Sequence, residues 1–584
     1  MLKISPYLSF FSFICAVNLL EVKNLRVSYN QDGTSVEVLK GIDFQVPMDS
    51  IVGIVGESGS GKTVTAMSIM QLLDKKSLQS SGSINWHESN TTIDFLKLQE
   101  EEIRSYRGAK IGMVFQEPMS ALNPILRCGF QVSEGLYAHH YGSKSQIKDR
   151  VLECFKLVGL TDLERVYNAY PFQLSGGQLQ RVLIALAISC KPKLIIADEP
   201  TTALDVSLQR KILELLKQLK KELGLSILFI SHDLNIVKEL CDYAIVMNQG
   251  KIIEQGNIQK IFENPEHAYT KGLINCRPPL KRKIRKLLTI QDFETPQTSN
   301  NRDHENSFVS QFEIDKRLQS LGLKKDLITV QKLNIRYTTG RTFFGKIKNE
   351  IHAVRDVSFT IKEGETLGLV GESGSGKSSI GRAILNLVKS SSEVIKYKEL
   401  NLNTVSQSNW RPLRKDLQII FQDPYGALNP KQIIGKALME PMEVHSLYNN
   451  PKDRKDKAMN LLETVGLEVS HFNRYPHQFS GGQRQRICIA RALSLEPKFI
   501  VCDEPVSALD VSIQAQILNL LVDLKNKFDL SYLFITHDLS VVNFIADRIA
   551  VMKDGEIIEY GNCNNIIHNP KTAYTQMLLA STPD

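Results

Sequence analysis

Hydrophobic residues along the chain fall into short, nearly unbroken runs that alternate with stretches of helical period. In the first half the runs are rich in Val and Ile and lie between turn residues, at 51–55, 111–115, 193–197 and 226–230. Runs of this length are typical of strands buried on both faces of a parallel sheet. Residues 208–223 instead have apolar positions every three or four residues, and Gly224 is placed to end a helix. The pattern predicts an α/β fold.

The chain contains a long internal repeat. Four short motifs of the first half return in the same order in the second, and three of them are separated from their counterparts by 305 residues. A repeat this long predicts two tandem domains and not a solenoid. We place domain 1 at 19–275, a linker at 276–326 and domain 2 at 327–584. Domain 1 is about ten residues longer than domain 2, in the polar stretch around 77–104.

The two segments outside the repeat differ in character. Residues 1–18 carry an apolar run that resembles a short secretory signal, and we expect a leader extension there. No stretch of eighteen apolar residues occurs, so no membrane span is expected. The linker opens with Pro278 and Pro279, passes through the basic run 281–286 and becomes rich in Gln, Thr, Ser and Asn. Such a composition predicts a mobile, solvated linker.

Composition adds little to this picture. A hydrophobic content of 42% and a charged content of 23% are ordinary for a globular protein and do not indicate disorder or a membrane protein. The net charge of +8 is small for 584 residues and suits phosphate ligands, so no nucleic-acid partner is expected. The nine cysteines lack metal-binding or paired spacing, which indicates a reducing compartment.

The first repeated motif is a phosphate-binding loop between a strand and a helix. It consists of Gly56, Glu57, Ser58, Gly59, Ser60, Gly61, Lys62 and Thr63, and again of Gly371, Glu372, Ser373, Gly374, Ser375, Gly376, Lys377 and Ser378. Glycines let backbone N–H groups curl around phosphates, and the helix N-terminus adds its positive dipole. The lysines supply charge to the γ-phosphate, and the hydroxyls of Thr63 and Ser378 can ligate Mg²⁺. The motif predicts ATP and Mg²⁺ as cofactors.

The second motif is a pair of acidic residues at the end of an apolar strand. Asp198 and Glu199 form the pair in the first domain, and Asp503 and Glu504 in the second. An aspartate in this place can hold Mg²⁺, and the glutamate beside it can orient or deprotonate the attacking water. The motif therefore predicts Glu199 and Glu504 as catalytic residues.

The third motif separates the chain from other nucleotide hydrolases. Ser175, Gly176, Gly177 and Gln178 follow Leu174, and Ser480, Gly481, Gly482 and Gln483 follow Phe479. In both domains the serine lies 24 residues before the glutamate. A Ser-Gly-Gly run that opens a helix offers a hydroxyl and bare N–H groups to a phosphate. Together with the acidic strand, these residues resemble the signature of the ABC ATPase family.

The resemblance implies roles for further residues. Gln116 and Gln422 match the family's Q-loop, which contacts the metal and the membrane partner, and Asp205 and Asp510 match the D-loop. His232 and His537, each 33 residues after the glutamate, match the switch histidine at the γ-phosphate. Tyr29 and Tyr337 stand where the family stacks an aromatic ring on adenine. The implied fold is two tandem P-loop domains, each with a mainly parallel core sheet, flanking helices and a helical signature subdomain.

Members of this family bind each nucleotide between the phosphate loop of one domain and the signature of the other. For this chain the resemblance implies one site from Lys62, Glu199 and Ser480, and a second from Lys377, Glu504 and Ser175. Phe479 and Val506 depart from the family pattern but leave the groups that face phosphate unchanged. We therefore expect two active sites in one chain.

Finer features resemble the oligopeptide, dipeptide and nickel importers. They are the Q-loop extensions 116–124 and 422–430, the segments 170–173 and 475–478, and the tails 264–270 and 569–575. The domains look fused as in importers of the glutathione and microcin C type. The resemblance implies two membrane permease subunits, a periplasmic or extracellular solute-binding protein reached through them, and a peripheral location on the cytoplasmic face of the inner membrane.

A different class of function also fits two ABC domains without a membrane span. Twin-ABC proteins that act on ribosomes share this organisation and would suit the basic charge. Their linker is long, helical and strongly charged, whereas this linker contains Pro278 and Pro279 and a polar patch. The tails at 264–270 and 569–575 also favour transport. Co-purifying proteins would separate the two alternatives.

Overall fold

The computed structural model describes residues 17–31, 34–74, 78–88, 91–201, 205–294, 308–341, 347–448 and 450–582. The chain divides into two compact units. Unit 1 comprises Met1–Leu204 and Leu208–Ile274, and unit 2 comprises Asp205–Ser207 and Asn275–Asp584. From here on we call domain 1 copy one and domain 2 copy two, and we describe each by itself. The exact domain limits given above stay a prediction, and the leader falls almost wholly outside the described residues.

The central sheet of copy one has six strands. They are β3 (Ile51–Val55), β6 (Ile111–Val114), β7 (Leu194–Asp198), β8 (Ser226–Ser231), β9 (Tyr243–Asn248) and β10 (Lys251–Asn257). Their order is β10-β9-β3-β8-β7-β6, and only the edge strand β10 runs antiparallel to its neighbour. The four strands expected from apolar runs are therefore confirmed to within one residue at each end.

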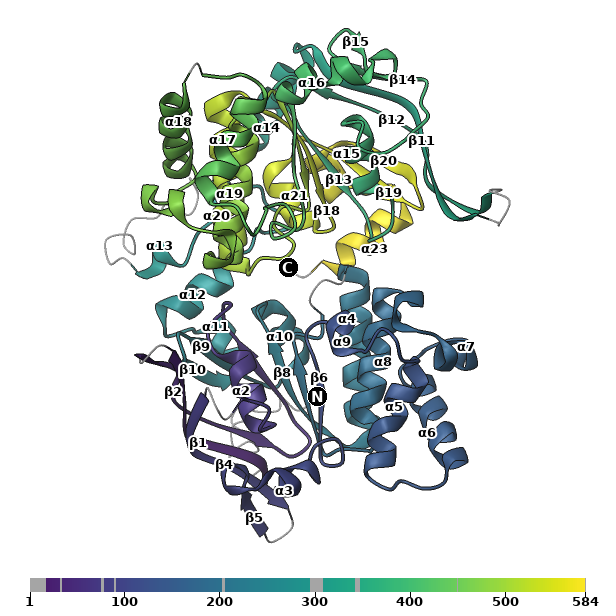
Figure 1. The fold of residues 1–584 in the computed structure, drawn as a ribbon, viewed down its shortest axis with the longest axis vertical. Coiled ribbons are helices and arrows are strands. Elements are labelled where there is room, and N and C mark those ends of the chain that lie inside the picture. Colours follow the sequence, from purple (N-terminus) through teal and green to yellow (C-terminus); the bar gives the residue numbers. More distant parts are fainter. Residues whose placement is uncertain are drawn as a thin grey trace, which may run out of the picture. The chain divides into compact units, whose positions relative to one another are not determined.

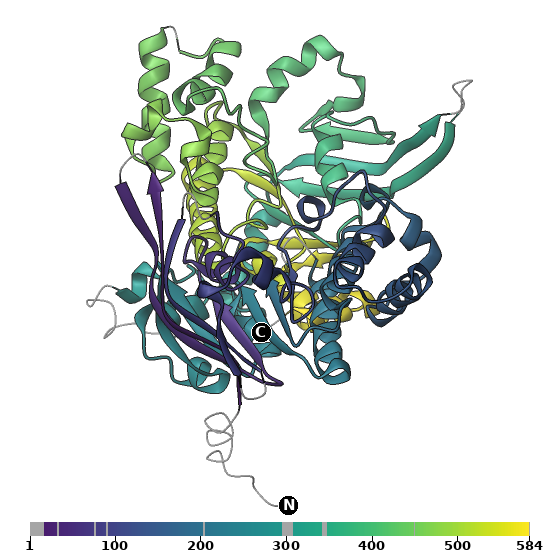
Figure 2. The same cartoon turned by 60° about the horizontal axis from the view of Figure 1, so that its bottom comes forward.

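A second sheet in copy one was not anticipated from the sequence. It is antiparallel and consists of β1 (Asn18–Gln31), β2 (Thr34–Pro47), β4 (Leu78–Glu88) and β5 (Thr91–Asp94), in the order β2-β1-β4-β5. The long paired strands β1 and β2 form the purple ribbon of Figure 2. The extra length of copy one lies here, because β4 and β5 form a longer hairpin than their counterparts in copy two.

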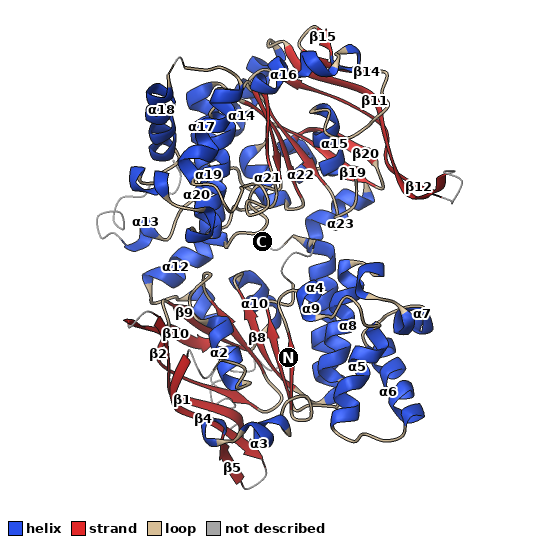
Figure 3. Ribbon diagram, viewed as in Figure 1, coloured by secondary structure: helices blue, strands red, loops and turns tan. Residues whose placement is uncertain are grey.

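Helices of copy one flank the central sheet or form a separate group. They are α2 (Lys62–Ile69), α3 (Glu100–Arg104), α4 (Pro118–Ala121), α5 (Cys128–Ala138), α6 (Lys144–Leu157), α7 (Leu163–Asn168), α8 (Gly176–Ile188), α9 (Val206–Leu223), α10 (Leu234–Leu240), α11 (Ile258–Glu263) and α12 (Ala268–Asn275). Helices α5 to α8 pack on one another beside the sheet (Figure 3). This group is the helical subdomain expected for the signature, which opens α8.

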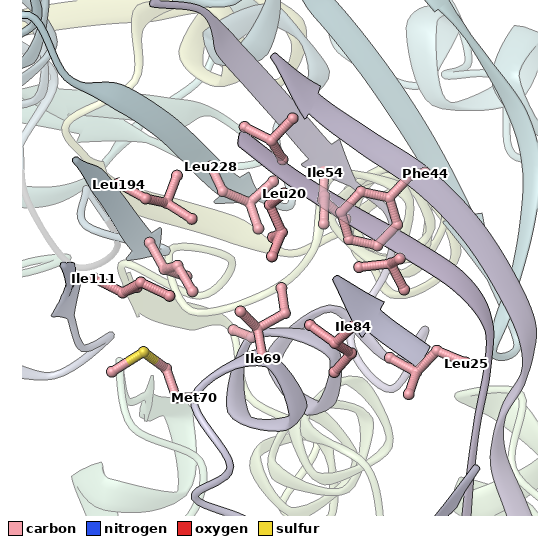
Figure 4. Close-up of a cluster of buried hydrophobic side chains, with 14 of the residues drawn as sticks. Leu20, Leu25, Phe44, Ile54, Ile69, Met70, Ile84, Ile111, Leu194 and Leu228 are labelled. Carbon is pink, nitrogen blue, oxygen red and sulfur yellow. The ribbon is translucent and has the colours of Figure 1, made fainter. Parts of the chain in front are cut away.

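The core of copy one fills the space between the two sheets and α2. Leu20 and Phe44 come from the antiparallel sheet, Ile54 and Leu228 from the central sheet, and Ile69 from α2 (Figure 4). All five are buried. Burial of a side chain of this size contributes about 1.5–3 kcal/mol. This packing fixes α2, and so the loop before it, against the ends of the strands.

Copy two repeats both sheets. The central sheet contains β13 (Thr366–Val370), β16 (Leu417–Ile420), β17 (Phe499–Asp503), β18 (Ser531–Thr536), β19 (Arg548–Lys553) and β20 (Glu556–Asn562), in the order β16-β17-β18-β13-β19-β20. The antiparallel sheet contains β11 (Asp326–Arg341), β12 (Ile347–Lys362), β14 (Val394–Tyr397) and β15 (Leu400–Asn401), in the order β12-β11-β14-β15.

The helices of copy two follow the same plan. They are α15 (Lys377–Ile384), α16 (Gln407–Asp416), α17 (Ile434–Val444), α18 (Pro451–Thr464), α19 (Gly481–Leu493), α20 (Val511–Phe528), α21 (Leu539–Ile545), α22 (Cys563–His568) and α23 (Ala573–Ser581). Helices α17, α18 and α19 pack together (Figure 1) and correspond to α5, α6 and α8. Among the residues that the structure describes, no helix is both long and apolar enough to cross a membrane.

The described parts of the linker pack on copy two, which corrects the expectation of a solvated chain. Leu280 and Leu287 are buried, and Leu280 belongs to a core cluster that includes residues of α21 and β19. The backbone N–H of Leu287 donates to Asn519 Oδ1, and Asn519 Nδ2 donates to the Leu287 carbonyl, both at 2.9 Å. The linker also forms α13 (Gln291–Glu294) and α14 (Gln311–Gly322). Apolar residues on either side of the basic run explain the difference.

Asp547 anchors the linker electrostatically. Its carboxylate accepts hydrogen bonds from Lys525 Nζ at 3.0 Å, from Arg317 Nε of α14 at 3.2 Å and from the backbone N–H of Thr366 at 2.9 Å. Burial raises the pKa of Asp547, but Lys525, Arg317 and Lys283 outweigh it and hold the pKa far below its usual range. The buried carboxylate of Asp547 therefore connects the linker, the central sheet and α20.

Replacing Asp547 by Asn should destabilise copy two by about 3 kcal/mol, because it leaves Lys525 buried without its counter-charge. Urea unfolding of the full chain, followed by circular dichroism, measures the effect. Asp529→Asn is the control: that side chain is 81% exposed and lies 3.8 Å from Lys324. We expect its cost to stay below about 1 kcal/mol. Equal effects of the two variants would show that the buried cluster does not anchor the linker.

Candidate active site

In both copies the phosphate loop connects a central strand to the helix behind it. Gly61 and Gly376 precede α2 and α15 with φ of 104° and 99°, in the left-handed region that favours glycine. A Cβ at Gly376 would lie 2.4 Å from the Ala353 carbonyl oxygen. The glycines therefore allow a turn that no larger residue could make here.

The loop lysines are buried and held by the loop itself. Lys62 Nζ donates to the carbonyls of Gly56 at 2.7 Å and Glu57 at 3.0 Å. Lys377 Nζ donates to the carbonyls of Gly371 and Glu372, both at 2.8 Å. Burial lowers the pKa of Lys377. Two backbone carbonyls of the loop thus hold each lysine side chain in place.

Ser60 is the buried serine of the first loop. Its side-chain oxygen is buried and makes no hydrogen bond to any residue that the structure describes. An unpaired buried hydroxyl costs about 1–3 kcal/mol.

The strand-end aspartates meet the hydroxyl that ends each loop motif. Thr63 Oγ1 donates to Asp198 Oδ1 at 3.3 Å, and Ser378 Oγ donates to Asp503 Oδ1 at 2.6 Å. Burial raises the pKa of Asp198 to about 6 and also raises that of Asp503. Asp503 Oδ2 is buried without a hydrogen bond from the described residues, although Arg382 lies 3.7 Å away. No sequence motif marks Arg382.

The glutamates occupy a strained backbone position. Glu199 and Glu504 follow β7 and β17 with φ of 46° and 47°, values uncommon for a residue other than glycine. Their N–H groups donate to the carbonyls of Ile230 and Ile535 at 3.0 Å. Strain of about 1–3 kcal/mol persists where the surrounding structure enforces it, typically at functional sites. Beyond this turn, the Glu199 carboxylate lies 3.8 Å from Lys62 of the phosphate loop.

Three side chains surround the carboxylate of Glu199. Gln116 Nε2 donates to Oε2 at 2.9 Å, His232 Nδ1 lies 3.2 Å from the same oxygen, and Lys62 Nζ lies 3.8 Å from Oε1. The strand-end motif, the Q-loop glutamine, the switch histidine and the loop lysine therefore meet around one carboxylate. These residues lie far apart in the sequence but close together in the fold.

Glu504 has the matching set in copy two. Gln422 Nε2 donates to Oε2 at 2.9 Å, and His537 Nδ1 lies 3.6 Å from it. Burial raises the pKa of Glu504, but His537 and Lys377 outweigh it, and the net shift is downward. Burial lowers the pKa of His537, but Glu504 outweighs it and the net shift is upward. The two shifts favour an ionised glutamate beside a protonated histidine.

The signature serines cap helices in the helical subdomains. The N–H of Gln178 donates to Ser175 Oγ at 3.3 Å, and the Ser175 N–H donates to Gln178 Oε1 at 3.1 Å. Ser480 and Gln483 make the same reciprocal pair at 3.3 and 3.1 Å. This is a capping box, and it leaves Gly176 at the exposed first turn of α8.

For the remaining predicted residues, the structure shows local contacts or partial exposure. Asp205 accepts from Ser207 Oγ at 2.9 Å, and Asp510 caps the start of α20 through its backbone. Tyr29 and Tyr337 are 37% and 38% exposed on β1 and β11. The Tyr337 hydroxyl donates to Ser379 Oγ at 3.0 Å, which places this ring beside the start of α15. The functional roles of all these residues stay predictions.

Comparison with known proteins decides the family. Residues 39–202 and 354–507 match the family described as ABC transporter, and residues 253–303 and 558–584 match that described as oligopeptide/dipeptide transporter, C-terminal region. The chain belongs to the ABC transporter ATPases. It is the ATP-binding, ATP-hydrolysing subunit of an oligopeptide-type importer, as the resemblance implied, and the matched C-terminal regions favour transport over the ribosome alternative.

Two relatives of the same name agree with this assignment. The chain is 41% identical over 570 residues to the glutathione import ATP-binding protein GsiA of Escherichia coli (strain K12), covering 97% of this chain and 90% of that protein. The protein of the same name from Shigella flexneri matches with the same identity and coverage. The solved dimer of the cassette MJ0796 bound to ADP and Pi is 32% identical and covers 41% of this chain and 98% of that chain, with a TM-score of 0.37.

Replacing Glu199 and Glu504 together by Gln should lower ATP turnover by at least about 100-fold, the range of a lost general base. Glutamine can still hydrogen-bond to Gln116 and Gln422, so we expect ATP to bind and remain bound. Phosphate release and retained nucleotide measure the two effects. Glu263→Gln, an exposed carboxylate on α11, serves as the control. Unchanged turnover in the double variant would refute the roles given to both glutamates.

Proposed function

We propose that the chain uses MgATP at both copies to drive the import of a short peptide or a related small solute, with glutathione the first candidate. In this proposal it acts on the cytoplasmic face of the membrane with two permease subunits, which receive the solute from a separate binding protein. The observation that carries the proposal is the double set of lysine, strand-end carboxylates, glutamine and histidine, joined to a transporter-type C-terminal region in each copy.

The relatives support the choice of solute class. GsiA of E. coli is named as a glutathione import ATP-binding protein, and its similarity to this chain extends over both domains and the linker. Glutathione is a tripeptide, which agrees with a C-terminal region shared with oligopeptide and dipeptide transporters. In this proposal the permeases and the binding protein select the solute.

The residues present fit a magnesium ion. Mg²⁺ prefers oxygen ligands and is commonly held by one or two protein groups together with nucleotide phosphates and water. Ser378 Oγ and Asp503 lie together, and Asp503 Oδ2 is a buried oxygen without a hydrogen bond from the described residues. Thr63 and Asp198 form the corresponding pair. Bound there, the ion would neutralise charge that builds up on the phosphates.

The side chains around the ion then divide the work of hydrolysis. Lys62 and Lys377 bind the terminal phosphates, because their charge is preorganised inside the loop. Glu199 and Glu504 accept a proton from, or orient, the attacking water. The histidines and the Q-loop glutamines hold the two carboxylates in place. The pairing of each loop with the signature of the other copy stays a prediction from the family.

The proposal predicts that cells lacking this chain lose uptake of the solute. Deletion strains should take up labelled glutathione or short peptides at least about tenfold more slowly if a single ATPase powers the route. Wild-type chain should restore uptake, and the Glu199→Gln, Glu504→Gln double variant should not. Nickel uptake, measured in parallel, separates the peptide from the metal branch of the family.

The partners can be tested in the same strains. Affinity purification of the tagged chain from detergent-solubilised membranes should recover permease subunits. Ribosomes in their place, together with normal uptake of every peptide tested, would overturn the proposed function.

A further inference from the structure

The transporter-type C-terminal regions reach into the nucleotide sites. Each contains a tyrosine, Tyr269 on α12 or Tyr574 on α23, and the two are 305 residues apart like most of the repeated motifs. The backbone N–H of Glu57 donates to the Tyr269 hydroxyl oxygen at 3.0 Å, and that of Glu372 donates to the Tyr574 hydroxyl oxygen at 3.2 Å. The same contact to the phosphate loop is therefore present in both copies.

The peptide group that receives this contact also holds the loop lysine. The N–H of Glu57 and the carbonyl of Gly56 belong to one peptide group, and that carbonyl accepts from Lys62 Nζ at 2.7 Å. In copy two the carbonyl of Gly371 accepts from Lys377 Nζ at 2.8 Å. A peptide group is planar, so its N–H and C=O cannot be oriented independently. A tyrosine on one side therefore fixes the acceptor of the lysine on the other.

Each tyrosine is itself held firmly. Tyr269 is 1% exposed and Tyr574 is 9% exposed. Burial raises the pKa of Tyr574 to about 12, so its hydroxyl keeps its proton and its oxygen remains a neutral acceptor at physiological pH. Lys553 Nζ lies 5.1 Å from the centre of the Tyr574 ring.

A carboxylate on the edge strand fixes the start of each tyrosine helix. Glu254 of β10 accepts from the backbone N–H groups of Glu266 at 2.9 Å and His267 at 3.1 Å. Glu559 of β20 accepts from the N–H of Lys571 at 2.9 Å and from Thr575 Oγ1 at 2.6 Å. The support thus runs from the edge strand through the helix to the phosphate loop.

We propose that Tyr269 and Tyr574 are positioning residues of the two ATP sites, which set the phosphate loop through the peptide group that holds its lysine. The C-terminal region of each copy is then part of the nucleotide site. This inference rests on the proposed roles of Lys62 and Lys377. It assigns the tyrosines no contact with ATP and no part in the chemical step.

Tyr→Phe variants test the proposal because they remove the hydroxyl and keep the ring. Each is measured in a chain that has one functional loop: Tyr269→Phe with Lys377→Ala, and Tyr574→Phe with Lys62→Ala. We expect the Kd for ATP to rise by about two- to tenfold, the effect of one lost hydrogen bond. Hydrogen–deuterium exchange of the loop amides should become faster without nucleotide. In the otherwise unchanged chain, the Tyr269→Phe, Tyr574→Phe double variant should raise KM for ATP and leave kcat within about twofold.

Tyr532→Phe is the matched control. The Tyr532 hydroxyl is also buried and donates to the Leu521 carbonyl at 3.2 Å. Among the residues that the structure describes, it makes no hydrogen bond to the phosphate loop. We expect it to leave the Kd for ATP and the loop exchange unchanged. Equal shifts in the control would reduce the tyrosines to a general structural role, and unchanged ATP affinity in both Tyr→Phe variants would overturn the proposal.

Variants of the two loop lysines distinguish failure of the tyrosine proposal from failure of the ATP-site assignment. Lys62→Ala and Lys377→Ala together should abolish ATP binding. If they do so while the Tyr→Phe variants bind ATP normally, the tyrosine proposal fails and the site assignment stands. If ATP still binds to the lysine double variant, the site assignment fails.

Discussion

A buried lysine charge is the constraint on which each nucleotide site depends. Lys62 and Lys377 are both 4% exposed, and a cation so placed is costly unless polar groups surround it. The loop supplies two carbonyls to each lysine, and Glu199 adds a carboxylate 3.8 Å from Lys62. Those acceptors stay in position only because the glycine turn, the strand and the following helix are packed as one unit. The core between the two sheets is therefore also what keeps the phosphate loop in shape.

The parallel sheet solves the problem of gathering residues that are distant in sequence. The loop leaves β3, the acidic pair ends β7, Gln116 follows β6 and His232 follows β8. The carboxyl ends of parallel strands lie at the same edge of a sheet, so the parallel order alone brings these four segments together there. The left-handed backbone at Glu199 adds the final adjustment, because it turns the carboxylate out of the strand direction and toward Lys62.

Much of the fold and of the site could be predicted from the sequence. Apolar runs indicate the buried strands, and the motifs indicate the loops that follow them. The apolar runs gave β3, β6, β7 and β8, and Gly224 correctly ends α9. The antiparallel sheet was missed because β1 and β2 are long strands of mixed character without a motif. The linker was misjudged because its composition is polar, while the few apolar residues that decide its packing, such as Leu280 and Leu287, are scattered. Backbone strain at Glu504 has no sequence signature, because only the tertiary structure imposes it.

The repeat within the chain separates contacts that the fold requires from those that one copy happens to make. Hydrogen bonds from lysine to loop carbonyl, from glutamine to glutamate and from loop N–H to tyrosine occur in both copies, although the residues around them differ. The bonds from Arg317 and Lys525 to Asp547 join the linker to the sheet in copy two. The bond from a strand N–H to this aspartate has a counterpart in copy one, from Ile51 to Asp242. Two sets of side chains thus arrive at the same geometry around the phosphate loop. A shared physical requirement explains this agreement better than accident, and holding a buried lysine ready for phosphate is the requirement that all these contacts serve.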